Sequence, residues 1–131
     1  MNFTWNDFLE LANEWQGNAV NSKRPLSLYR SIASRAYYAV FHQAFALAKD
    51  SGLQSTTSAS DHFHLRKFFE NRGRNARQLS LHLRDLYDLR IDADYSLTAI
   101  AFSQEKAAAS AQRAIEKASR AMEMIEYLLA R

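Results

Sequence analysis

Apolar residues recur at helical spacing in five segments of the chain, and no segment shows the alternation of a β-strand. The first segment carries an apolar stripe at steps of three and four residues, formed by Trp5, Phe8, Ala12, Trp15 and Ala19. Thr4, with Asp7 three residues later, predicts a capping box at the start of this helix. Residues 17–25 read as a connection, and Pro25 suits the first turn of the next helix, where a missing N–H costs nothing.

The second helix is predicted from about Leu26 to Lys49, ending before Ser51. Apolar residues cover so much of its circumference that we expect it to be the central, most buried helix. The polar stretch 53–60 then reads as a loop. Ser58 with Asp61 predicts another capping box, before a short helix around residues 62–72 that ends at Gly73.

Two further helices complete the pattern. The fourth carries a stripe of Leu79, Leu83, Leu86, Arg90 and Ala93, and residues 95–98 are predicted to begin the next connection. The last runs from a cap at Ser103 to Arg131, with a seam of Ala107, Ala111, Ala114, Ala118, Ala121, Ile125 and Leu128. Because most of this seam is small, a neighbouring helix can approach closely. We therefore expect one all-α domain over residues 1–131, an antiparallel bundle of four or five helices.

Composition supports this reading and excludes several classes of protein. The 131 residues make one domain, 47% are hydrophobic, and only 3 Gly and 1 Pro are present, too few for a turn-rich β fold. The lack of cysteine excludes a disulfide scaffold, thiolate chemistry and most structural zinc sites. The sequence has neither a membrane-spanning run nor a signal peptide, which predicts a soluble, cytoplasmic protein without a membrane partner.

Two arginines break the apolar stripes, Arg35 on the second helix and Arg90 on the fourth. A guanidinium among apolar residues needs partners, because burying an unpaired charge is costly. Helical spacing supplies them and predicts one polar cluster where these helices meet, consisting of Arg35, Tyr38, His42, Arg90, Asp94 and Tyr95. Such a cluster is either a core network that fixes helix register or a ligand-binding site.

The stretches ASRAYYAVFHQA (33–44) and LYDLRIDADYSL (86–97) resemble the HEPN domain family, and most closely its small, stand-alone prokaryotic members. The resemblance extends over most of the chain and includes the order of the helices. It implies a helical bundle that forms a homodimer and associates with a nucleotide or RNA. It also implies a role in a toxin–antitoxin or defence-type system, with a minimal nucleotidyltransferase as an operon partner.

Many relatives of this kind are metal-independent ribonucleases with an Arg-x4-6-His signature, from which this chain departs. Tyr95 stands where a histidine would follow Arg90. A literal match lies at Arg77 and His82, but five steps along a helix turn the two side chains about 140° apart. His62 and His64, two residues apart, do not form a metal site with any cysteine or well-spaced carboxylate. No metal or other cofactor is expected.

The net charge of +3 is concentrated in one part of the chain. Residues 62–84 carry six basic residues and a single acid, Glu70, for a net charge of +5, whereas the remainder carries −2. The basic residues of this patch are Arg66, Lys67, Arg72, Arg74, Arg77 and Arg84. A run of this kind forms either a solvated face or a surface for phosphate groups.

Three functions follow as hypotheses. The favoured one is a non-catalytic HEPN module that binds a nucleotide, RNA or a partner protein. The second is a metal-independent endoribonuclease toxin using Arg77 and His82, or an unorthodox site at Arg90. The third is a structural partner subunit of a minimal nucleotidyltransferase.

Overall fold

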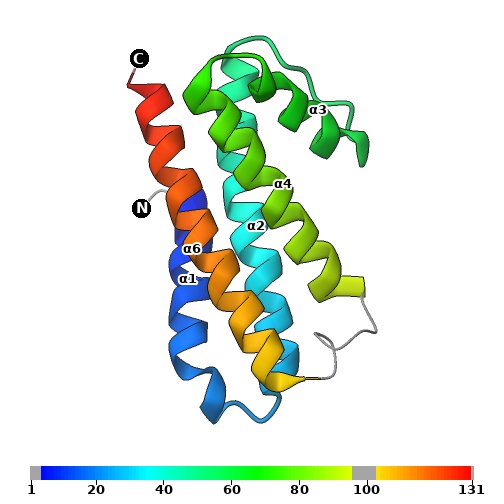
Figure 1. Cartoon of the computed structure of the whole chain (residues 1–131), viewed down its shortest axis with the longest axis vertical. Coiled ribbons are helices and arrows are strands. Elements are labelled where there is room, and N and C mark those ends of the chain that lie inside the picture. Colours follow the sequence, from blue (N-terminus) through cyan, green and yellow to red (C-terminus); the bar gives the residue numbers. More distant parts are fainter. Residues whose placement is uncertain (1–3, 96–102, 131) are drawn as a thin grey trace.

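The computed structural model describes residues 4–95 and 103–130, and within these ranges all regular structure is helical. Its elements are the α-helices α1 (Trp5–Asn18), α2 (Pro25–Asp50), α3 (Ser60–Glu70), α4 (Arg74–Tyr95) and α6 (Gln104–Leu129), and a 3₁₀ turn, η1 (Ala19–Asn21). Helices α1 and α4 run opposite to α2 and α6, and the short α3 lies at the end of the bundle where α2 ends and α4 begins (Figure 1). The predicted all-α helical bundle is confirmed.

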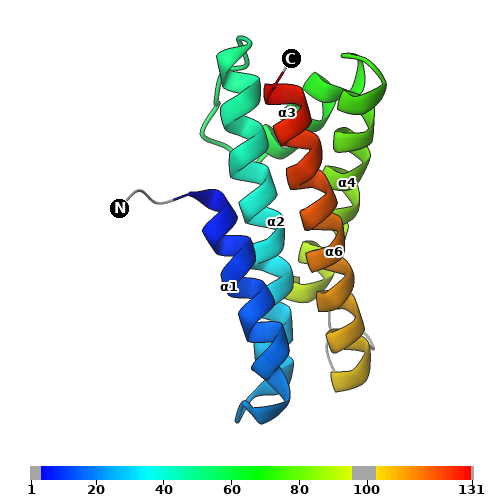
Figure 2. The same cartoon turned by 90° about the vertical axis from the view of Figure 1, so that its left-hand side faces the viewer.

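Helix α2 is the centre of the bundle, as predicted, and it packs against each of the other four α-helices (Figure 2). Its buried residues occupy most of its circumference and include both large and small apolar side chains. Pro25 is its first residue, and it ends at Asp50, one residue beyond the predicted bound at each end. Gly52 follows with φ +108°, a conformation that glycine adopts without a steric penalty.

The alanine seam of α6 is buried, and its principal neighbour is α2. These two helices run in the same direction, so the small side chains allow a close approach between parallel helices. The hydroxyl of Ser103 accepts a hydrogen bond from the Lys106 backbone N–H at 3.3 Å, which confirms the predicted cap. Residue 131 and the predicted connection at 96–98 lie outside the described residues.

The predicted capping box at Ser58 is wrong. Helix α3 begins at Ser60, without a side-chain cap. The Asp61 carboxylate turns back to the preceding loop, where it accepts hydrogen bonds from the Thr56 backbone N–H at 2.8 Å, the Thr56 hydroxyl at 2.7 Å and the Ser55 hydroxyl at 2.8 Å. Several donors converging on one carboxylate favour this arrangement over a single capping bond. At the start of α1 the Thr4 backbone N–H does donate to Asp7, at 3.2 Å.

Helices α3 and α4 form a hairpin around Gly73, whose φ is +103°. The Ser80 hydroxyl donates to the Arg66 carbonyl at 3.0 Å and joins the two helices. Leu65 and Phe69 on α3 and Leu79 and Leu83 on α4 are buried in the common core. The exposed sides of the two helices are thereby held next to each other. No helix among the described residues is long and apolar enough to cross a membrane.

Candidate functional site

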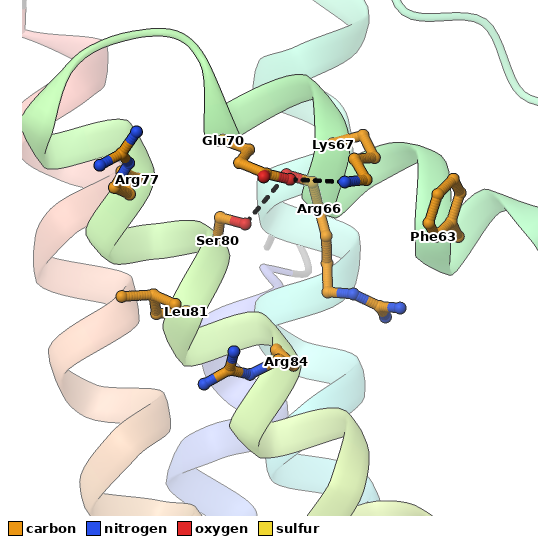
Figure 3. Close-up of a pocket in the computed structure, with 8 residues that line it drawn as sticks. All are labelled: Phe63, Arg66, Lys67, Glu70, Arg77, Ser80, Leu81 and Arg84. Carbon is orange, nitrogen blue, oxygen red and sulfur yellow. Dashed lines mark hydrogen bonds and ion pairs between the residues drawn. The ribbon is translucent and has the colours of Figure 1, made fainter.

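A groove of about 370 Å³ lies between α3 and α4, and four of the six residues of the predicted basic patch line it (Figure 3). Arg66 and Lys67 come from α3, and Arg77 and Arg84 come from α4. Helical spacing explains the convergence, because Arg77 and Arg84 are seven residues apart and so share one face of α4. We call this site the α3–α4 groove.

Little negative charge compensates the cations of the α3–α4 groove. Glu70, the one carboxylate in its lining, pairs with Lys67 at 3.1 Å. Arg84 contacts Asp85 at 3.5 Å, in a pair exposed enough to contribute little. Arg77 forms no ion pair within residues 4–95 and 103–130. The groove therefore presents a net positive potential to solvent.

The other two residues of the basic patch lie beside the groove. Arg72 stacks on the Phe68 ring, with its Cζ 3.8 Å from the ring centroid. Arg74 lines an adjoining cavity of about 410 Å³ at the Gly73 turn, and Arg77 lines both cavities. Positive charge therefore continues around the end of the α3–α4 hairpin.

Phe63 is a residue of the groove that sequence reasoning missed. Its side chain is 50% exposed, which is unusual for a large aromatic residue, and it lines the groove beside Lys67, whose Nζ lies 5.6 Å from the ring centroid. Phe63 precedes Arg66 by three residues and Lys67 by four, and this helical spacing was the available signal that the three side chains share one face of α3. Phe69, in contrast, is buried in the core.

The predicted polar cluster forms in part around Arg90. Its Nε pairs with Asp94 at 2.9 Å, and its Cζ lies 5.2 Å from the Tyr38 ring centroid and 5.6 Å from that of Tyr95. Arg35 does not join these contacts. Its Cζ lies 5.1 Å from the rings of both Phe8 and Trp15 on α1, because α2 turns Arg35 toward α1 rather than α4.

Four of the six predicted members nevertheless line one cavity of about 430 Å³ between α1, α2 and α4. Arg35, Tyr38, His42 and Asp94 line it. Arg90 and Tyr95 are absent from the lining, and Tyr95 is 67% exposed at the end of α4. We call this site the α1–α2 cavity.

Arg77 and His82 do not converge. Helix α4 begins at Arg74, before both residues, and continues to Tyr95, so the two side chains point in different directions. Arg77 lines the α3–α4 groove, whereas His82 lines a separate cavity with Arg120 and Tyr127 on the side of α6. Within one chain this pair does not form a nuclease site.

Sequence reasoning weighed His62 only as a metal ligand, whereas in the structure its ring packs against aromatic residues of α2. It lies on the buried face of α3, one and two turns before Leu65 and Phe69, and its ring stacks on Phe41 at 4.4 Å. A hydrogen bond joins Nδ1 to the hydroxyl of Tyr37. Burial raises the pKa of Tyr37 well above its usual range, so the hydroxyl keeps its proton and donates it to this bond.

Burial, Arg90 and Arg66 all lower the pKa of His62. The imidazole is therefore neutral near pH 7 and accepts the Tyr37 hydrogen bond, in agreement with the protonated hydroxyl. One guanidinium nitrogen of Arg66, Nη1, is buried with no hydrogen-bond partner among residues 4–95 and 103–130, and the Arg66 Cζ lies 5.0 Å from the Tyr87 ring centroid.

No group of three metal-ligating side chains occurs within the described part of the chain. The fold and the site together define a helical bundle with a cationic groove on its short hairpin. Comparisons with protein-family models, curated proteins and solved structures find no match for this chain.

Proposed function

We propose that the protein is a non-catalytic, HEPN-like module that binds single-stranded RNA in the α3–α4 groove. The observation that carries this proposal is the convergence of four cations from two helices on one groove, with a single carboxylate in its lining. RNA phosphates bind to such a surface by ionic contacts and release of counterions.

The exposed Phe63 ring supports RNA over other polyanions. Proteins that bind single strands without reading sequence combine a positively charged groove with aromatic rings on which bases stack. Phe63 stands in the lining of the groove, beside cations spaced along both helices. A duplex would keep its bases stacked inside, where this ring does not reach them.

A paired substitution tests the groove. Arg77 and Arg84 are exposed, so Arg77→Gln with Arg84→Gln removes two charges without disturbing the core. Lys23→Gln with Arg24→Gln is the matched control, because these residues are also exposed and lie beside the start of α2, at the other end of the bundle (Figure 1). Fluorescence anisotropy with a short labelled poly(U) RNA measures binding by each variant.

We expect the groove variant to bind poly(U) about tenfold or more weakly than the wild type, and the control to bind about as well as the wild type. An equal loss of poly(U) affinity in both variants would contradict the proposal, because it would show that RNA is held by diffuse charge attraction and not in the groove. We also expect the RNA to remain intact after long incubation with a metal chelator. Cleavage under these conditions, lost in Arg77→Ala and His82→Ala, would favour the endoribonuclease instead.

The resemblance to HEPN proteins adds proposals about partners. We propose a homodimer that acts in a toxin–antitoxin or defence-type system, with a minimal nucleotidyltransferase as a partner. Light scattering is expected to give twice the chain mass of 15.0 kDa. A monomer at high concentration would contradict the dimer. Copurification with a nucleotidyltransferase, without RNA binding, would favour the structural subunit.

A further inference from the structure

The α1–α2 cavity is separate from the α3–α4 groove and has a different chemistry. At about 430 Å³ it is large enough for a small organic ligand. Helix α1 contributes Trp5 and Phe8, α2 contributes Ser34, Arg35 and His42, and α4 contributes Asp94. No residue lines both sites.

Among the described residues that line this cavity Arg35 is the only cation, and the Asp94 carboxylate of the same lining pairs with Arg90 instead of with Arg35. Its side chain is partly buried against the rings of Phe8 and Trp15, and it forms no ion pair in the described ranges 4–95 and 103–130. The nearby Arg90, by contrast, is paired with Asp94 at 2.9 Å. Aromatic faces hold Arg35 in place but leave its hydrogen-bond donors for an anion.

A stack of rings forms one wall of the cavity. The rings of Trp5 and His42 are stacked with centroids 4.0 Å apart and an interplanar angle of 23°, and Tyr38 also stacks on His42, at 5.8 Å. Phe8 meets Trp5 edge-on at 5.2 Å. Burial lowers the pKa of His42, so near pH 7 this imidazole is uncharged and does not add a second cation to the wall. The aromatic side chains that line the cavity, Trp5, Phe8, Tyr38 and His42, offer apolar surface against which a planar ring of a ligand can pack.

We propose that the α1–α2 cavity binds a small ligand in which one anionic group is attached to a planar aromatic ring. Arg35 binds the anion, and the ligand ring packs on the wall formed by Trp5 and His42. The Ser34 hydroxyl and the Asp94 carboxylate accept hydrogen bonds from hydroxyl or amino groups of the ligand. A single uncompensated cation favours one anionic group over a di- or triphosphate.

Nucleoside monophosphates and aromatic carboxylic acids both have this chemistry, and titration separates them. The chain has two tryptophans, Trp5 in the cavity and Trp15 beside Arg35, so intrinsic fluorescence reports binding. The probes are AMP and 4-hydroxyphenylacetate, with adenosine as the ring without an anion and inorganic phosphate as the anion without a nucleoside. Arg35→Gln removes the cation, Arg35→Lys keeps its charge, and Arg77→Gln with Arg84→Gln is the control.

We expect AMP or 4-hydroxyphenylacetate to bind saturably, at least tenfold more tightly than either adenosine or phosphate. Arg35→Gln should weaken this binding by about tenfold or more, and Arg35→Lys by less, since it keeps the charge but loses the planar fork. The groove variant should bind the small ligand like the wild type even where it loses RNA. This control separates failure here from failure of the proposed RNA groove.

Two results would overturn the assignment. One is a folded Arg35→Gln protein that binds the probes as the wild type does. The other is a wild-type protein that binds neither anionic probe, or binds adenosine as well as AMP. Because this second result concerns the wild type alone, the proposal remains testable even if Arg35→Gln does not fold.

Discussion

Arg90 is held by a carboxylate and by two aromatic rings, which is an unusual amount of support for one surface-proximal arginine. Its side chain is 14% exposed, and that of its partner Asp94 is 28% exposed. The pair is therefore less solvated than the exposed pair of Arg84 and Asp85, for which the values are 59% and 36%. Because solvent screens an exposed ion pair more strongly, we expect the Arg90–Asp94 pair to contribute more to the free energy of unfolding than the Arg84–Asp85 pair.

We expect Arg90→Leu to lower the free energy of unfolding by about 1–2 kcal/mol, because it leaves Asp94 half-buried without its cation and removes packing on Tyr38. Arg84→Leu should change it by no more than about 0.5 kcal/mol. Urea denaturation measures both values. An equally stable Arg90→Leu protein would show that the pair does not fix the register of α2 and α4.

His62 makes the stability of the fold depend on pH. A histidine in an unfolded chain titrates near pH 6.5, and the pKa of folded His62 is lower, since burial, Arg90 and Arg66 all disfavour the imidazolium. Between these two pKa values the unfolded chain binds more protons than the folded chain. The contribution of neutral His62 to the free energy of unfolding is therefore fully present above about pH 6.5. It decreases as the pH falls from there toward the lower pKa of folded His62.

We expect the melting temperature of the wild type to fall between pH 7.5 and pH 5.5, a range set by the unfolded histidine pKa of about 6.5. His62→Gln should weaken this dependence without abolishing it, because burial also lowers the pKa of His42 and His82. His64→Gln, on the exposed side of α3, is the matched control. A melting temperature of His62→Gln that falls as steeply as that of the wild type would contradict this role for His62.

At the scale of the elements, the α3–α4 hairpin depends on the backbone of Gly73. A side chain added there would meet no atom within 4 Å, but the φ of +103° is one that residues with a Cβ rarely adopt. Gly17 also has open space around it, and it lies in helical backbone near the end of α1. The two glycines therefore differ in backbone conformation and not in available space.

We expect Gly73→Ala to destabilise the protein by about 1–2 kcal/mol through backbone strain, and Gly17→Ala to stabilise it by about 0.4–1 kcal/mol through the lower entropy of the unfolded chain. Thermal denaturation followed by circular dichroism tests both substitutions. The same sign of effect at both positions would contradict the assigned turn.

The sequence pattern predicted the elements better than it predicted contacts between them. The helical period and Pro25 were local signals, and they placed α2 within one residue of its observed bounds. The capping box predicted at Ser58 was wrong because the Asp61 carboxylate accepts hydrogen bonds from Ser55 and Thr56 in the preceding loop instead of from the Ser58 backbone. Gly73 indicated the turn after α3 for a reason that is also local, because its positive φ is one that glycine adopts without a steric penalty.

The two sites were predicted to different degrees for the same reason. The basic patch was evident as a charge run, and the groove follows from folding that run into a hairpin. Arg35 was identified as exceptional, but its partners on α1 were not, since no spacing within α2 indicates which neighbour an arginine will meet. The exposed Phe63 was missed because an aromatic residue in a helix is usually buried.

At the scale of the whole molecule, the charge is polarised. The hairpin end carries the excess of positive charge, whereas the rest of the chain has a small negative balance. A polyanion is therefore drawn to one end of the bundle and weakly repelled elsewhere. The α1–α2 cavity shares no lining residue with the α3–α4 groove, so the two proposed ligands can bind together.

The salt dependence of RNA binding tests the central claim most directly, because the slope of log affinity against log salt counts phosphate contacts. Four groove cations predict a slope near −3 for single-stranded RNA at about −0.7 per contact, and Arg77→Gln with Arg84→Gln should reduce its magnitude by about 1.4. Lys23→Gln with Arg24→Gln should leave the slope as it is in the wild type. A slope that is unchanged in the groove variant, or reduced equally in the control, would contradict RNA binding in the α3–α4 groove.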